Sequence, residues 1–138
     1  MSYQSDLHEW TKEQADALRR RASNALDWDN LAEEIESLGS SQRREIRSRL
    51  KILLVHLLKW KHQPEGRCGN WRGSIEEARD QIEDLLEENP SLRTYPEECL
   101  AKAYASARRR ALDETGLLGL PEACPWSVDK VIAADFLP

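Results

Sequence analysis

One histidine lies inside the most apolar stretch of the chain, and its chemistry depends on what faces it. His56 is the polar residue within residues 52–58. A buried imidazole needs hydrogen-bond partners for its ring nitrogens. Helical spacing places Glu34 at the margin of an apolar face carried by residues 31–38, which predicts a contact between Glu34 and His56 across two helices. Such a buried pair could form an enzyme or metal site, or it could satisfy a hydrogen bond within the core.

We favour a hydrogen bond within the core over a metal site or a catalytic site as the role of Glu34 and His56. A metal site in a helical bundle uses three or more ligands, often from a Glu-x-x-His pattern, and the sequence contains neither that pattern nor His-Glu-x-x-His. No complete set of catalytic residues accompanies the histidine. We therefore expect no metal and no cofactor, and we favour a protein that is not an enzyme over one built on Glu34 and His56.

The second place for chemistry is a strongly basic segment. Residues 43–72 contain nine Lys or Arg and two acids, a net charge of +7 that leaves −12 for the rest of the chain. Arginines beside tryptophans in a glycine-rich stretch can bind anions or stack on bases. The segment predicts a surface that contacts another macromolecule. A protein is the leading partner, and nucleic acid is the weaker alternative because the pI is about 5.3. The candidate contact residues are Arg43, Arg44, Arg47, Lys61, Arg67, Trp71 and Arg72.

An acidic helix could instead cover this basic surface within the same molecule. Residues 75–88 carry seven acids against one Arg, so a neighbouring helix of this kind would neutralise the basic one. Trp60 and Trp71 also lie on the apolar registers of their helices, which makes core anchoring the alternative to base stacking. Whether the basic segment is exposed or covered therefore decides between a binding surface and internal pairing.

The composition favours helices and excludes a membrane span. Of the 138 residues, 40% are hydrophobic and 33% are charged. The longest apolar stretch is seven residues, whereas a bilayer requires about 20. Residues 1–6 lack the basic and apolar run of a secretory signal, and the three cysteines include no Cys-x-x-Cys pair. These features predict free thiols and a cytoplasmic location, and they leave the oligomeric state open.

Hydrophobic periodicity predicts an all-α, single-domain bundle over residues 1–138. The expected helices cover about residues 5–22, 27–38, 42–60, 74–89 and 96–115, followed by a short helix capped by Ser127. The bundle has five main helices if Gly39 breaks the second helix and four if it does not, plus the short C-terminal one. Residues 62–73 hold Pro64 and three glycines and are expected to form a loop. The next helix is expected to open at a capping box at residues 74–77.

Several motifs distributed along the chain resemble one bacterial family. They are Leu31-Ala-Glu-Glu-Ile-Glu-Ser-Leu-Gly39 preceded by Trp28, Ser48-Arg-Leu50, Leu54-Val-His-Leu-Leu-Lys-Trp60, Trp71 ahead of Ile75, residues 85–92, Cys124-Pro125 and the ending Asp135-Phe-Leu-Pro138. This combination is similar to the family called domain of unknown function 29. The resemblance implies a small all-helical domain with no established activity, and it supplies no catalytic residues.

Overall fold

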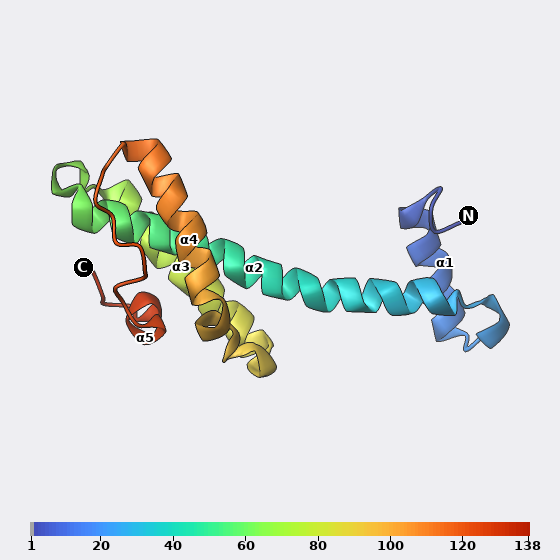
Figure 1. Cartoon of the computed structure of the whole chain (residues 1–138). Helices are drawn as coiled ribbons and strands as arrows, with labels where there is room; N and C mark the ends of the chain where they lie inside the picture. Colours follow the sequence, from blue (N-terminus) through green and yellow to red (C-terminus); the bar gives the residue numbers. More distant parts are fainter. Residues whose placement is uncertain (1) are drawn as a thin grey trace. The chain divides into compact units, whose positions relative to one another are not determined.

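The computed structural model describes residues 2–138 and shows an all-α protein. The helices are α1 (Leu7–Arg19), α2 (Trp28–His62), α3 (Gly69–Glu88), α4 (Tyr95–Thr115) and the short α5 (Val128–Ile132), in the order shown in Figure 1. No strand occurs in this part of the chain. The predicted all-α fold is therefore confirmed, and of the four to five main helices expected the described residues form four, followed by the short C-terminal helix. None of the helices formed by residues 2–138 combines the length and the apolar composition that crossing a bilayer requires.

At Gly39 the structure shows the continuous helix of the two alternatives, and the expected start of α3 is wrong. Helix α2 runs through Gly39 without interruption, because a glycine inside a long helix costs only about 1 kcal/mol, which the 35 residues of the helix tolerate. Helix α3 begins at Gly69, with Cys68 at its N-cap, so the capping box at residues 74–77 lies inside the helix. The loop after α2 is consequently shorter than predicted and contains a single 3-10 turn, Pro64–Gly66.

The chain divides into two compact units, Met1–Ser41 and Gln42–Pro138, and α2 contributes to both. In the first unit, Asp6 caps α1 by accepting a hydrogen bond of 3.0 Å from the amide of Glu9. Trp10 is buried, and its indole Nε1 donates to Asp27 at 3.0 Å. Gln14 accepts a hydrogen bond of 2.7 Å from the Asp27 amide. The single domain over residues 1–138 stays a prediction.

Three large apolar side chains of α2 are exposed within the first unit. Trp28, Ile35 and Leu38 are 63%, 69% and 64% exposed, so the apolar face indicated by the spacing is present but uncovered. The side-chain hydrogen bonds of this unit involve other positions: Trp10 of α1 donates to Asp27, which precedes α2, and Tyr3, which precedes α1, donates to Glu34 of α2. These bonds do not involve the three apolar side chains, which stay uncovered.

The second unit holds the hydrophobic core, formed by the second half of α2 together with α3, α4 and the C-terminal segment (Figure 1). Residues 52–58 of α2 are apolar on nearly every side and therefore lie among the other helices. Helix α4 packs through a row of small residues, Ala103, Ala107 and Ala111, which permits close approach of its neighbours. The core side chains of α2 that are buried are Ile46, Leu50, Leu53, Leu54, Val55, Leu57 and Leu58.

Arg79 fastens the C-terminal segment to α3. Its side chain is buried, and its Nε donates to the Val131 carbonyl at 2.9 Å. Its Nη2 donates to the Phe136 carbonyl at 2.7 Å, and its Nη1 to that of Ala134 at 3.5 Å. A carbonyl in the last turn of a helix has no hydrogen-bond partner within that helix, and Arg79 supplies that partner for the Val131 carbonyl of α5.

Candidate anion-binding groove

A groove rich in cations lies between α2 and α4 in the second unit. Its volume is about 290 Å³. The α2 side of the groove is formed by one face of the helix, because residues 44, 47, 48 and 51 follow the spacing i, i+3, i+4 and i+7. The residues that line it are Arg44, Arg47, Ser48, Lys51, Lys102, Ala103 and Ser106. We call this site the α2/α4 groove.

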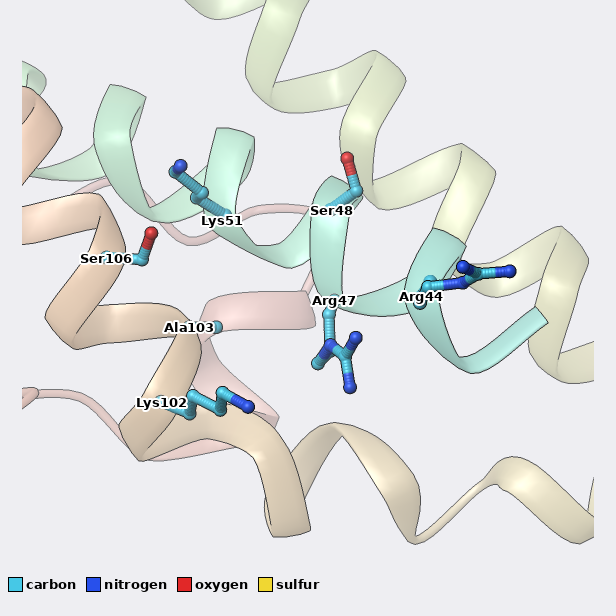
Figure 2. A pocket seen from close by; sticks show the side chains of 7 residues that line it. All are labelled: Arg44, Arg47, Ser48, Lys51, Lys102, Ala103 and Ser106. Carbon is cyan, nitrogen blue, oxygen red and sulfur yellow. The ribbon is translucent and has the colours of Figure 1, made fainter. Parts of the chain in front are cut away.

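The charge of the α2/α4 groove is uncompensated. Four of its seven lining residues are cationic and none is acidic. Among residues 2–138, the structure gives Arg44, Lys51 and Lys102 no ion-pair or hydrogen-bond partner. Arg47 is held in place, since its Nη1 donates to the hydroxyl of Tyr95 at 3.1 Å. Figure 2 shows the guanidinium of Arg47 and the amine of Lys102 in the gap between the two helices.

The acidic helix α3 does not neutralise this groove. No ion pair within residues 2–138 joins α3 to the cations of α2. Arg49 of α2 lines a pocket together with Asp84 and Glu88 of α3. Arg49 itself pairs with Glu45 of its own helix at 2.8 Å. The internal pairing that the sequence left open is therefore absent at the α2/α4 groove.

A second cavity of about 470 Å³ adjoins the groove along α4. The two cavities share Lys102 and Ser106. Arg109 lines the second cavity and is exposed, whereas Arg108 donates to the carbonyls of Leu120 and Pro121 at 3.1 and 3.0 Å. The cationic surface thus continues along α4, beyond the basic segment that the sequence singled out.

Arg67 and Trp71, two candidate contact residues that follow α2, interact with side chains and backbone of the second unit. Arg67 donates to the Trp60 carbonyl at 2.7 Å, and its guanidinium lies 5.2 Å from the centre of the Trp60 ring. The Lys59 ammonium lies 5.1 Å from the centre of the Trp71 ring. Such cation–π contacts bring these tryptophans into the structure as anchors, and both side chains are half-buried.

The other basic candidates fall outside the groove. Arg72 lies 3.7 Å from Glu76 in the first turns of α3. Lys61 is exposed in the last turn of α2, and Arg43 is exposed on α2 without lining the groove. Of the sequence-predicted contact residues, the structure therefore brings together Arg44 and Arg47 and leaves the others elsewhere on the second unit.

Glu34 and His56 belong to one helix and not to two facing helices, because α2 continues through Gly39. Each has a partner of its own. Glu34 accepts a hydrogen bond from the hydroxyl of Tyr3, which raises the pKa of Tyr3 to about 12. His56 is half-buried, and its Nδ1 pairs with the Ile52 carbonyl of the preceding turn at 2.9 Å. The predicted contact between Glu34 and His56 is wrong, since it assumed a helix break at Gly39.

His56 instead lines a small pocket of about 100 Å³ that also contains Glu114. Lys59 and Arg110 each lie 3.1 Å from the Glu114 carboxylate. The hydrogen bond from Lys59, aided by Arg110, lowers the pKa of Glu114 below its ordinary value. A carboxylate held in this way is a weak base. Residues 2–138 contain no group of three or more side chains arranged to hold a metal ion.

Sequence reasoning missed the half of the groove that lies on α4. Lys102 and Ser106 are one helical turn apart, as are Arg44 and Ser48, so each helix shows a cation followed four residues later by a hydroxyl. That repeated spacing was the available signal. It does not reveal that the two faces oppose each other, which depends on how α4 packs on α2.

The fold and the groove define an all-α protein whose second unit carries an uncovered cationic site. The sequence profile of the family Domain of unknown function DUF29 matches residues 2–137, and the chain therefore belongs to this family. Comparison with curated proteins and with solved structures finds no match. Family membership confirms the resemblance seen in the sequence motifs and assigns no activity.

Proposed function

We propose that the protein is a binding module that uses the α2/α4 groove to hold an acidic segment of another protein. The observation that carries this proposal is the set of four cations in the groove with no carboxylate among its lining residues. Cations kept close together repel one another, and a bound anion removes that cost. The prior orientation of Arg47 by Tyr95 lowers the entropy lost when the anion binds.

An acidic protein segment suits the site better than nucleic acid does. The chain has a net charge of −5, so a long polyanion that extends beyond the groove would meet carboxylates. The exposed side of α3 alone presents Glu76, Glu77, Asp80 and Asp84. A short acidic segment can place its charges in the groove and avoid these residues. We further propose that the protein acts in the bacterial cytoplasm, where unpaired cysteines stay reduced.

Binding of a fluorescein-labelled peptide of Glu and Gly residues, followed by fluorescence polarisation, tests the proposal. Arg44→Glu and Lys102→Glu should each raise the Kd of the peptide about tenfold, since each replaces an attraction of roughly 1–2 kcal/mol by a repulsion. Arg43→Glu is the matched control, because Arg43 adjoins Arg44 and is exposed but does not line the groove. It changes the net charge equally and should change the Kd less than about threefold.

Two results would contradict the proposal. If Arg43→Glu weakens binding as much as Arg44→Glu does, the peptide responds to the general positive field of the segment and not to the groove. If a labelled DNA duplex binds more tightly than the peptide at the same salt concentration, the partner is nucleic acid. Melting temperatures of all three variants should match that of the native protein, because the substituted residues are exposed.

A further inference from the structure

Two serines line the α2/α4 groove together with its four cations. Ser48 belongs to α2 and Ser106 to α4, and both line the groove (Figure 2). The structure gives neither hydroxyl a hydrogen-bond partner within residues 2–138. Serine in a helix commonly bonds back to the carbonyl four residues earlier, so two unpaired hydroxyls on residues that line one groove are available to a ligand.

We propose that the α2/α4 groove binds a phosphoryl group carried on the acidic partner segment, an inference that rests on the proposed function because it concerns the same surface. A phosphate monoester carries a charge of about −1.5 to −2 at neutral pH and presents three acceptor oxygens. A carboxylate carries one charge and two oxygens. Four cations and two neutral hydroxyl donors match the first group more closely than the second.

The donors differ in kind, which also suits a phosphoryl group. Arg47 offers a planar fork of N–H donors, whereas Lys51 and Lys102 offer compact charges on flexible stems. Buried Ala103 lies between the lining residues of α4 and leaves space where a larger side chain would fill the groove. The volume of about 290 Å³ accommodates one phosphoryl group with the side chain that bears it.

The adjoining cavity indicates where the rest of the segment lies. It shares Lys102 and Ser106 with the groove and extends the cationic surface to Arg109. A carboxylate that neighbours the phosphorylated residue can reach Arg109 there. The cavity also contains the acidic side chain of Glu122, which disfavours a second phosphoryl group at that position.

Three labelled peptides of one acidic sequence, with Ser, phosphoserine or Glu at the central position, test this inference by fluorescence polarisation. The phosphoserine peptide should bind at least about tenfold more tightly than the Ser peptide. The ratio of the two Kd values should fall towards one in the double variant Lys102→Gln, Ser106→Ala. It should stay unchanged in Arg43→Gln, which removes an exposed charge outside the groove.

The outcomes separate this inference from the proposed function. If the phosphoserine and Glu peptides bind equally and the double variant weakens both, the phosphoryl inference is wrong and the proposed function stands. If none of the three peptides binds, both are wrong. Inorganic phosphate is the competitor that identifies the source of the group. If it displaces the phosphoserine peptide at a concentration equal to the Kd of that peptide, the groove binds free phosphate and the partner segment contributes nothing.

Discussion

Replacement of Arg79 by alanine should release the C-terminal segment from α3. Arg79 is 4% exposed and donates to three backbone carbonyls, of which those of Val131 and Phe136 lie at 2.9 and 2.7 Å. Alanine removes all three bonds and leaves these carbonyls facing a cavity. The edge-to-face contact of Trp126 with Phe136, whose ring centres lie 6.0 Å apart, should loosen together with the segment.

The expected cost follows from the bonds and from the burial of the charge. Two short hydrogen bonds from a charged donor contribute about 3–6 kcal/mol before desolvation. Burial lowers the pKa of Arg79, which shows that the protein environment disfavours the charged form and offsets part of that gain. The net loss for Arg79→Ala should therefore be about 3–4 kcal/mol. Arg79→Met, which restores the apolar stem without the charge, should lose about half as much.

Urea unfolding followed by circular dichroism measures this loss, and hydrogen exchange locates it. Amides of residues 128–136 should exchange faster in Arg79→Ala, while those in the second half of α2 should keep their protection. The matched control is Arg72→Ala on the same helix, because Arg72 is 63% exposed and lies 3.7 Å from Glu76. This control should stay within about 0.5 kcal/mol of the native protein. If Arg79→Ala also stays within about 1 kcal/mol and exchange at residues 128–136 is unchanged, Arg79 does not hold the segment and the reasoning is refuted.

Three further predictions concern burial, pH and packing. Burial, with the nearby charge of Lys61, lowers the pKa of His62 below its value of about 6.5 in the unfolded chain. The stability that neutral His62 contributes is therefore fully present above about pH 6.5 and is lost as the pH falls below that value. His62→Gln should make the melting temperature depend less on pH in this range. An unchanged pH dependence would contradict the prediction. Gly66→Ala should cost about 1–3 kcal/mol in urea unfolding, because the added Cβ would lie 2.6 Å from the Trp71 ring, whereas Gly73→Ala, with open space and a helical setting, should stabilise by about 0.5–1 kcal/mol. Leu38→Ser should leave the melting temperature within about 2 °C of the native value, because Leu38 is 64% exposed, and a larger drop would show that another surface covers it.

The helices of the second unit could be predicted because their apolar spacing matches their burial. The stretch at residues 52–58 is apolar on nearly every side, and it lies at the centre of the core. The path of α2 through Gly39 could not be predicted, since glycine ends some helices and is tolerated inside others. Exposure of Ile35 also could not be predicted, because periodicity shows that a helix has an apolar face and not what covers that face.

The candidate site could be predicted in part, for a related reason. Charge counting identified Arg44 and Arg47, because basic residues were concentrated in one segment. Lys102 and Ser106 lie in a helix of mixed charge, and only the packing of α4 on α2 makes them part of the groove. Arg79 lies four residues after buried Ile75, on the inner face of an otherwise acidic helix, and charge alone does not distinguish it from an exposed arginine.

Mapping of amide chemical shifts tests the central claim, that an acidic protein segment binds in the α2/α4 groove, most directly. The ¹⁵N-labelled full chain is titrated with the unlabelled Glu and Gly peptide, and the shift of each backbone amide is followed. The claim predicts that the largest shifts fall on both walls of the groove, at residues 44–51 of α2 and 102–106 of α4, and that Lys102→Glu abolishes them. Shifts concentrated at residues 61–72, or in the first unit, with none on α4, would contradict it.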